Sequence, residues 1–271
     1  MLTGQPAGHF TPLLRNPAAA ATMPVVYAIV VVPCFNEERR LDLDAFRRVR
    51  LGEHRVDFCF VDDGSRDGTR HVLESLHDED PQRFSVVALE RNSGKAEAVR
   101  RGIVAAQELT PDLFGFWDAD LATPLSELPS FIDILARHPQ IEMVFGSRVR
   151  LLGRDISRRA SRHYVGRVGA TLISASLGLA VYDTQCGAKL FRNTAATREV
   201  FVTPFLSRWI FDVEIIARFA QANGRAAAAA AIYELPLQVW HDVHGSKVKA
   251  HDFVRALRDL WKIHRAYRPA G

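Results

Sequence analysis

The sequence predicts an α/β fold with a mostly parallel β-sheet flanked by helices, and three observations lead to this class. Apolar runs alternate with segments of helical periodicity along most of the chain. The apolar runs are continuous, which is typical of strands buried on both faces of a parallel sheet. Polar clusters follow the runs directly, as they do where open α/β sheets bind ligands.

The elements follow one another in a strand–helix repeat. VVYAIVVVP precedes a helix predicted over residues 44–49, and VDFCFV precedes a helix over 69–77. FSVVAL leads into a helix over 95–107, LFGFW leads into a helix over 125–137, and MVFG ends the series as a fifth strand. This repeat predicts parallel strands joined by crossover helices.

Both ends of the chain are predicted to differ from the central domain, residues 23–249. Residues 1–22 are rich in Pro, Ala and Gly without periodicity, which indicates a disordered tail. Residues 250–271 are predicted to form a C-terminal amphipathic helix, which suits a membrane interface, a packed helix or a dimer contact. Its expected apolar face holds Phe253, Leu257, Leu260, Trp261 and His264, and its basic face holds Arg255, Arg258, Lys262 and Arg265.

Composition excludes several classes of protein. The chain has 271 residues, 48% of them hydrophobic and 24% charged, so it is globular. A net charge of +4 is compatible with phosphate-rich partners, namely nucleotides, nucleic acid or anionic membranes. Three cysteines without paired spacing fit a reducing cytoplasm. Since no apolar run approaches the roughly 18 residues of a spanning helix and no signal peptide is recognisable, we expect a soluble or peripheral protein.

The candidate site lies at the ends of four predicted strands. PCFNEE follows the first strand, DDGSRDGT the second, ERNSGK the third and DADLATP the fourth. Because parallel strands end at the same edge of a sheet, these clusters should face one crevice. Turn formation explains any one of these aspartates but not the whole set.

The motifs reduce the number of ligand classes that fit this crevice. A dinucleotide fold needs GxGxxG after its first strand, where this chain has PCFNEE, and the phosphate-loop pattern matches only at Gly94 and Lys95. Asp118 and Asp120 also have the spacing of aspartyl-phosphate phosphatases, but Ala122 stands where those enzymes have Thr or Val. Two carboxylates at this spacing suit Mg²⁺ or Mn²⁺ on a diphosphate, because these ions combine few carboxylates with phosphate oxygens and water.

Together, PCFNEE, DDGSRDGT, NSGKAEAVRRG and DADLATP resemble the nucleotide-sugar-binding half of inverting family 2 glycosyltransferases, which have the Rossmann-like GT-A fold. YDTQCGAKLFR, RWIFDVEI and LQVWHDVHGSK further resemble dolichyl-phosphate glucosyltransferases and bacterial polyprenyl-phosphate relatives. The resemblance runs from about residue 25 to residue 249, and it departs from the eukaryotic pattern at Leu121, where a glycine is usual.

The resemblance implies an enzyme that transfers a hexose, with glucose expected, from UDP-glucose to a polyprenyl phosphate at the inner, cytoplasmic face of a membrane. Mg²⁺ or Mn²⁺ is the implied cofactor, and nucleic acid is not an expected partner. One alternative is a glycosyltransferase that uses another nucleotide sugar as donor or a hydroxyl group as acceptor. The other alternative is a non-catalytic module that binds a nucleotide sugar.

The resemblance also implies roles for individual residues on the donor side. The expected donor-binding residues are Pro33, Asn36, Glu37, Asp62, Asp63 and Lys95. The first three shape the base pocket, one or both aspartates hold uracil and ribose, and the lysine approaches the diphosphate. Asp118 and Asp120 take the sugar nucleotide and the metal, and we expect both to be catalytic.

The acceptor determines which side chains the other side needs. A sugar hydroxyl needs a general base near neutral pH, whereas a lipid phosphate is already anionic and needs cations. Arg148, after the fifth strand, and Lys247, in GSK, are the expected catalytic cations. The other expected substrate contacts are Asp183, Gln185, Arg208, Asp212 and Glu214. With a hydroxyl acceptor, Asp212 or Glu214 would be the base.

Overall fold

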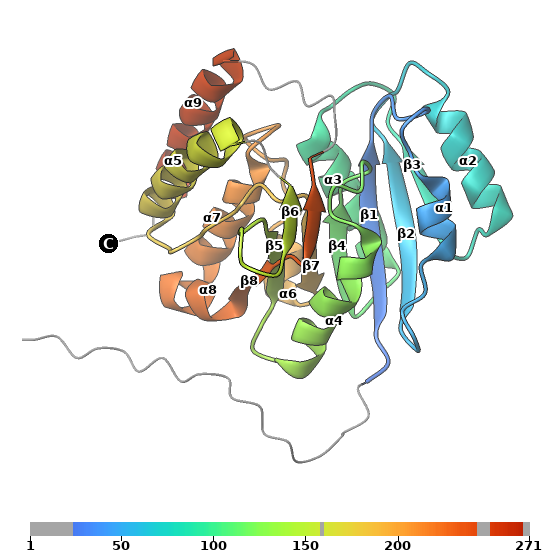
Figure 1. Ribbon diagram of the computed structural model, residues 1–271, viewed down its shortest axis with the longest axis horizontal. Helices are drawn as coiled ribbons and strands as arrows, with labels where there is room; N and C mark the ends of the chain where they lie inside the picture. The colour runs from blue at the N-terminus through green and yellow to red at the C-terminus, as the bar shows by residue number, and fades with distance from the viewer. Residues whose placement is uncertain (1–23, 158–159, 243–249, 268–271) are drawn as a thin grey trace, which may run out of the picture.

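The computed structural model describes residues 24–157, 160–242 and 250–267, and a seven-stranded β-sheet forms its centre (Figure 1). The strands are β1 (Tyr27–Cys34), β2 (Arg55–Asp62), β3 (Phe84–Ala88), β4 (Leu113–Trp117), β5 (Met143–Ser147), β7 (Ala188–Arg192) and β8 (Ile232–Pro236). They lie in the order β3-β2-β1-β4-β7-β5-β8. β7 runs antiparallel to β4 and β5, and the remaining pairs are parallel.

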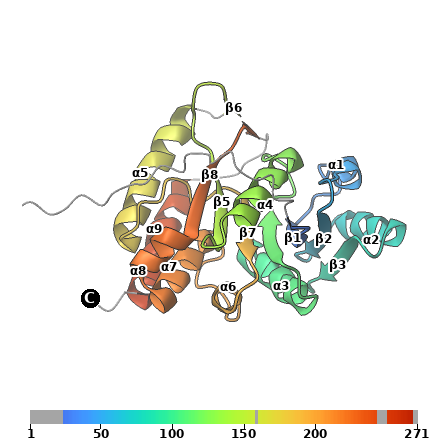
Figure 2. The same ribbon diagram turned by 90° about the horizontal axis from the view of Figure 1, so that it is seen from below.

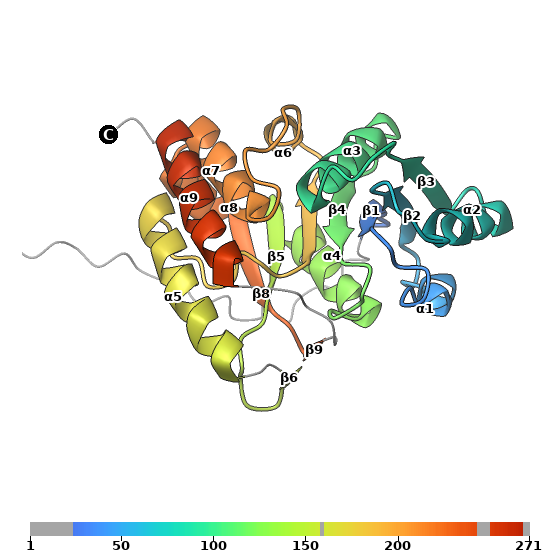
Figure 3. The same ribbon diagram turned by 90° about the horizontal axis from the view of Figure 1, so that it is seen from above.

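Helices cover both faces of this sheet (Figures 2 and 3). One face carries α1 (Leu43–Arg48), α2 (Thr69–Glu79), a short 3₁₀ turn (Leu125–Glu127) and α4 (Leu128–Arg137). The other carries α3 (Lys95–Glu108), α5 (Ala160–Leu177), α6 (Ala195–Glu199), α7 (Phe211–Asn223), α8 (Arg225–Ala231) and α9 (Ala250–Ala266). A two-stranded sheet of β6 (Asp155–Ser157) and β9 (Val239–His241) lies apart from the main sheet.

Alternate residues of β1 belong to different halves of the core. Ala28, Val30 and Val32 pack with α1, α2 and α4, whereas Ile29 and Val31 pack with α3 and α7. All five side chains are buried, so the strand has no solvent-exposed face. This burial explains the continuous apolar run and confirms the predicted α/β fold with its mostly parallel sheet.

The antiparallel strand β7 is the main feature that the sequence did not reveal. Its run AKLFR resembles any other buried strand, so direction could not be inferred from pattern. The fit of β7 against β4 depends on Gly115, because a Cβ there would lie 2.1 Å from the carbonyl oxygen of Lys189. β7 brings the segment before it to the same sheet edge at which β4 ends.

The C-terminal helix α9 packs on the domain, alongside α5 and α7 (Figure 3). Ala256, Leu260 and Ile263 face the core, and Ile263 is fully buried. Leu257 and Trp261 are 43% and 59% exposed. The apolar face predicted from the sequence is therefore wrong in part, because the core-facing stripe is rotated toward Ile263.

Candidate active site

A cavity opens at the carboxyl edge of the sheet, where β1, β2 and β4 end. Its volume is about 310 Å³. The residues that line it and that the sequence proposed as substrate or metal ligands are Pro33, Glu37, Asp63, Lys95, Asp118 and Asp120. Because these strands are parallel neighbours, the polar segments that follow them meet at one place.

Asp118 and Asp120 stand on the turn that follows β4. The N–H of Asp118 donates to the Gly187 carbonyl at 2.9 Å, which ties this turn to the start of β7. Gly187 leaves room for the carboxylate, since a Cβ there would lie 1.9 Å from Asp118 Oδ2. Leu121 has a φ of 50°, in the left-handed region that favours glycine. The turn thus carries backbone strain at the position where the family pattern has glycine.

The charges around this turn are unevenly balanced. Lys95, the first residue of α3, places its Nζ 2.5 Å from Asp118 Oδ1. Burial alone would lower the pKa of Lys95, but the charges of Asp118 and Asp212 outweigh it and raise that pKa. Burial raises the pKa of Asp120, and the neighbouring charge of Asp118 raises it further. The cavity therefore holds negative charge that Lys95 does not fully compensate.

A divalent cation fits this arrangement. Burial and the charge of Asp118 raise the pKa of Asp120 although the charge of Lys95 acts to lower it, and a bound cation would favour the ionised form of Asp120 further. Glu37 lines the same cavity but is paired with Arg40 at 2.5 Å. Within the described ranges no cluster of three or more acidic, His or Cys side chains could hold a metal by itself. Mg²⁺ and Mn²⁺ suit such a site, because diphosphate oxygens and water complete their coordination.

Asp63 shapes the wall of the cavity next to α3. Its two carboxylate oxygens accept hydrogen bonds from the N–H groups of Ser93 at 2.6 Å and Gly94 at 2.8 Å. Burial nevertheless raises the pKa of Asp63. Arg208 lies close to Gly94 and donates to Asn92 Oδ1 at 2.9 Å. Asp63 thus fixes the loop before α3 and also faces the cavity.

Asn36 and Asp62 hold the neighbouring loops together. Asn36 Oδ1 accepts from the N–H of Arg66 at 2.9 Å, and Asp62 Oδ1 accepts from the N–H of Ser65 at 3.0 Å. The Ser65 hydroxyl in turn accepts from the N–H of Asn36. These contacts make Asn36 and Asp62 supports of the loops beside the cavity.

Arg148 forms an ion pair with Asp183 beside the main cavity. Arg148 Nε donates to Asp183 Oδ2 at 2.6 Å and Nη2 donates to Oδ1 at 2.7 Å. Burial opposes the charge of Arg148, but the Asp183 carboxylate outweighs it and raises the pKa of Arg148. The guanidinium also lies over the Trp240 ring, 5.4 Å from its centroid. Glu234 accepts the N–H of Asp183, so this pair belongs to a larger hydrogen-bonded cluster.

Asp212 lies deeper than the cavity-lining carboxylates, at the start of α7. It is 4% exposed, and its Oδ1 lies 2.6 Å from Nζ of the fully buried Lys189. Gln185 Nε2 approaches Asp212 Oδ2 at 3.4 Å. The charge of Asp212 also raises the pKa of Lys95. Acidic and basic side chains therefore alternate from the cavity into the core, in the order Asp118, Lys95, Asp212 and Lys189.

Glu214 lies away from the cavity and is fully buried. Its Oε1 accepts a hydrogen bond from Arg218 Nη2 at 2.7 Å, one helical turn along α7. Its Oε2 accepts the N–H of Leu206 at 2.8 Å. Protein donors therefore engage both carboxylate oxygens of Glu214, and Glu214 is not among the residues that line the cavity.

Several residues of this region escaped the motif search. Lys189 and Arg218 are buried charged residues in two elements that consist mostly of apolar residues, AKLFR and FDVEIIARFA. Such residues are rarely buried unless they are paired, which is the signal that could have found them. Arg218 also follows Glu214 by four positions on a helix, the spacing of an ion pair.

Part of the predicted acceptor side lies outside the described residues. Lys247 belongs to this part, and no side chain is described for Arg158, Arg159, Arg162 or Arg167. Of the basic segment after β5, Arg150 is exposed and Arg154 is partly buried. Of the two proposed acceptor cations, the structure therefore describes Arg148 alone.

Comparison with known proteins places this site in context. The profile described as Glycosyl transferase family 2 matches residues 29–198. Dolichyl-phosphate beta-glucosyltransferase of Saccharomyces cerevisiae is 30% identical over 264 residues, which cover 89% of this chain and 75% of the yeast protein. The Homo sapiens protein of the same name is 31% identical over 235 residues, covering 81% and 68%.

Solved structures of glucosyl-3-phosphoglycerate synthase of Mycobacterium tuberculosis share the fold. One superposes with a TM-score of 0.62 at 19% identity and covers 89% of this chain and 80% of that one. Another, with a TM-score of 0.61 at 19% identity over 89% and 79% of the two chains, was solved in complex with Mn²⁺, UDP-glucose and phosphoglyceric acid.

Proposed function

The chain belongs to glycosyl transferase family 2, and from that premise we propose that it transfers glucose from UDP-glucose to a polyprenyl phosphate of the dolichyl type. The observation that carries the donor half is the cavity that gathers Asp118, Asp120 and Lys95 at one sheet edge. The acceptor half is supported by relatives that are 30% identical over most of their length and are named dolichyl-phosphate beta-glucosyltransferases.

The residues of the cavity fit the departure of a nucleoside diphosphate. As the bond between the sugar and UDP breaks, negative charge grows on the leaving phosphate. Lys95, held at the start of α3 by Asp118, supplies positive charge there. Asp118 and Asp120 would hold Mg²⁺ or Mn²⁺, and this ion would neutralise further charge on the diphosphate. Pro33 and Asp63 are the proposed walls of the nucleotide pocket.

An acceptor phosphate would attack the anomeric carbon with an oxygen that is already ionised, from the face opposite to UDP, and give a β-linked product. This step releases no proton, so the protein has to position and screen the anion and does not need a base. Arg148 and Lys247 are the proposed cations. The hydrogen bonds to Asp183 use Nε and Nη2 of Arg148 and leave Nη1 outside that pairing.

A hydroxyl acceptor is the second candidate, and the position of Asp212 favours it. Asp212 lies within reach of Gln185 and influences Lys95, so it is near the reacting groups. Its ion pair with the buried Lys189 weighs against it, because a base must give up that partner when it takes a proton. Glu214 is a weaker candidate than Asp212, because hydrogen bonds from Arg218 and Leu206 occupy both of its carboxylate oxygens.

Peripheral binding at the cytoplasmic face of a membrane is also part of the proposal. Among the helices of the described ranges, none combines the length and apolarity that crossing a bilayer demands. Leu257 and Trp261 are exposed on α9, and Arg258 and Lys262 accompany them. Leu152, at the tip of the turn before β6, is fully exposed. Exposed apolar side chains beside arginine and lysine suit an anionic lipid surface.

A donor panel against one acceptor tests the proposal. The protein, Mn²⁺ and a polyprenyl phosphate in detergent would be incubated with UDP-glucose, UDP-galactose, GDP-mannose or UDP-N-acetylglucosamine. We expect product only, or fastest, with UDP-glucose, with the mass of the acceptor plus one hexose. Binding of UDP-glucose without product would instead indicate a nucleotide-sugar-binding module.

A further inference from the structure

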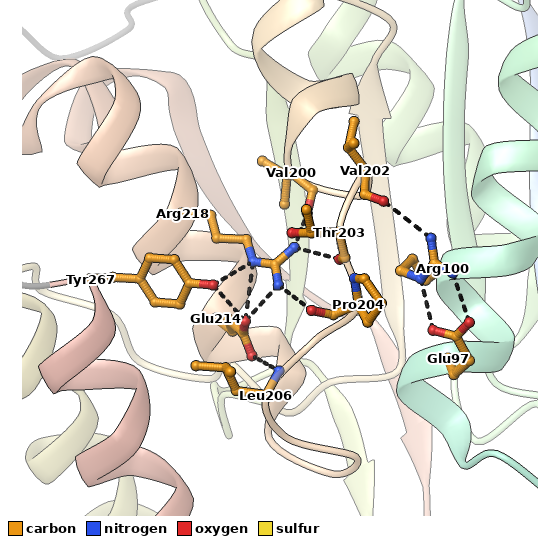
Figure 4. A network of polar contacts seen from close by, with 10 residues as sticks. All are labelled: Glu97, Arg100, Val200, Val202, Thr203, Pro204, Leu206, Glu214, Arg218 and Tyr267. Atoms are coloured by element: carbon orange, nitrogen blue, oxygen red, sulfur yellow. Dashed lines mark hydrogen bonds and ion pairs between the residues drawn. The ribbon is translucent and has the colours of Figure 1, made fainter.

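The loop between α6 and α7 is held by a buried guanidinium (Figure 4). Arg218 Nη1 donates to the carbonyl oxygens of Val200 and Thr203, both at 2.8 Å, and Nη2 donates to that of Pro204 at 2.7 Å. Its Nη2 and Nε also contact Glu214 Oε1. A single side chain thus fixes three carbonyl groups of one loop, which irregular backbone needs when it is buried.

Tyr267 completes this network from the end of α9. Its hydroxyl donates to Glu214 Oε1 at 2.9 Å and accepts from Arg218 Nε at 3.1 Å. Burial raises the pKa of Tyr267, and the charge of Glu214 raises it further, so the phenol stays protonated as a donor. We call Glu214, Arg218 and Tyr267 the clasp.

The clasp fixes the backbone immediately before Arg208. Glu214 Oε2 accepts the N–H of Leu206. The next residue, Ser207, donates its hydroxyl to Asp259 of α9 at 3.0 Å. Ser207 Oγ also accepts the N–H of Ile210 at 3.0 Å, which ties the loop to the start of α7. The direction in which Arg208 leaves the loop is therefore determined by α7 and α9.

Arg208 reaches from this loop to the wall of the donor cavity. Its Nη2 donates to Asn92 Oδ1 at 2.9 Å, and Asn92 and Gly94 both line the cavity. A Cβ on Gly94 would lie 2.6 Å from Arg208 Nε. In the described part of the chain, the Arg208 guanidinium donates to the backbone and side-chain oxygens of Asn92, and its charge acts to lower the pKa of Asp63 against the effect of burial. Arg208 is thus an exposed cation held in place by neutral partners.

We propose that Glu214, Arg218 and Tyr267 are positioning residues that hold Arg208 against the donor cavity, where its guanidinium screens the nucleoside diphosphate. This inference rests on the proposed function for the identity of the ligand. It assigns the C-terminal helix a part in donor binding, because Tyr267 and Asp259 both belong to the attachment of the loop.

A double-mutant cycle tests the proposal. Arg208→Ala should weaken the affinity for UDP in the presence of Mn²⁺ by about 10-fold, as expected for loss of a charged contact. Tyr267→Phe keeps the ring and removes only the hydroxyl, so it should weaken the same affinity by about 3-fold. In the Arg208→Ala background, Tyr267→Phe should have no further effect, because the clasp acts through Arg208.

Two controls separate positioning from general stability. Tyr27→Phe removes a phenol that binds Asp57, at the opposite end of β1 from the cavity, and should leave UDP affinity unchanged. Arg208→Lys keeps the positive charge and should recover part of the lost affinity. In steady state, Tyr267→Phe should raise the KM for UDP-glucose more than it lowers kcat.

Three results would overturn the inference. They are unchanged UDP affinity in Tyr267→Phe, an equal loss in Tyr27→Phe, and an undiminished effect of Tyr267→Phe when Arg208 is already Ala. UDP binding is measured by calorimetry without turnover, so absence of sugar transfer by the wild-type protein would refute the proposed function and leave this test standing.

Discussion

The donor side of the site, on β1, β2 and β4, and the opposite side, on β7, α7 and α9, both carry many charged side chains but use them differently. On the donor side, Asp118 and Asp120 face a cavity with more negative charge than Lys95 balances. On the opposite side, Lys189 and Arg218 are each paired with a buried carboxylate. The charged side chains of the donor side face a cavity that can hold a ligand, whereas those of the opposite side bind other side chains and the backbone. The residue type alone does not distinguish the two groups, but their contacts do.

The largest expected effect comes from removing a carboxylate from the donor side, which tests whether the charges there serve ligand binding. Asp120→Asn should lower the rate of glucose transfer by about 100-fold or more, because metal and diphosphate binding lose a charged ligand. The fold should persist, since within the described ranges the Asp120 side chain accepts a hydrogen bond only from the N–H of Ala122. Initial rates in Mn²⁺ and thermal unfolding check both statements, and full wild-type activity in excess chelator would contradict the role of the metal.

Removing a cation from the opposite side should mainly lower the stability of the fold. Arg218→Met leaves Glu214 buried without a counter-charge and should lower the free energy of unfolding by about 3–5 kcal/mol. Lys95→Met should cost far less stability, because Lys95 faces the cavity and its side chain is 36% exposed. Urea unfolding of both variants measures the difference, and equal losses would remove the distinction between the two sides.

The pH dependence of metal binding tests whether the donor-side carboxylates bind a cation. Burial and Asp118 raise the pKa of Asp120 in the metal-free protein, so ionisation of Asp120 opposes folding. Its contribution to stability is therefore fully present below the unfolded pKa and is lost as pH rises through the folded pKa. Mn²⁺ binds the ionised form, so the rise in Tm that Mn²⁺ produces should grow as the pH rises from about 4, the ordinary pKa of an aspartate, through the raised pKa of Asp120.

The matched variant for this measurement is Asp120→Asn. It should abolish most of the Mn²⁺-dependent rise in Tm at every pH. A Mn²⁺ effect of the same size at about pH 4 and at neutral pH would contradict metal binding by Asp120.

The smallest expected effect concerns the outer surface of α9. Replacing both Leu257 and Trp261 with Ser should reduce flotation with anionic vesicles by about 10-fold, since the two exposed side chains would otherwise enter the lipid interface. Leu109→Ser is the control, because Leu109 is 58% exposed at the end of α3, away from α9. Equal flotation of all variants would exclude α9 as the lipid-binding surface.

Much of the fold could be predicted from the sequence, because each strand and helix before residue 148 has its own periodicity and end signals. The position of β7 could not, since a buried strand has the same apolar pattern in either direction. The face of α9 was partly mispredicted because Leu257 and Ile263 are equally apolar, and only contacts with α5 and α7 decide which of them is buried.

The donor side of the site was also readable from the sequence, since its residues follow strand ends in short motifs. The opposite side was not, because the residue that partners a charge lies far along the chain or on another element. Glu214 is the clearest case. Its motif suggested a substrate contact or a base, whereas the Arg218 guanidinium and the Leu206 N–H occupy both of its oxygens.

The central claim is that the acceptor is a lipid phosphate and not a hydroxyl group. One experiment compares the two acceptors directly. Transfer from UDP-glucose is measured on a polyprenyl phosphate and on the matching polyprenol, from pH 5.5 to pH 8.5, for the wild type and Asp212→Asn. The account predicts product with the phosphate, little with the alcohol, and no limb of the pH profile that disappears in Asp212→Asn. Faster transfer to the alcohol, abolished by Asp212→Asn, would contradict it.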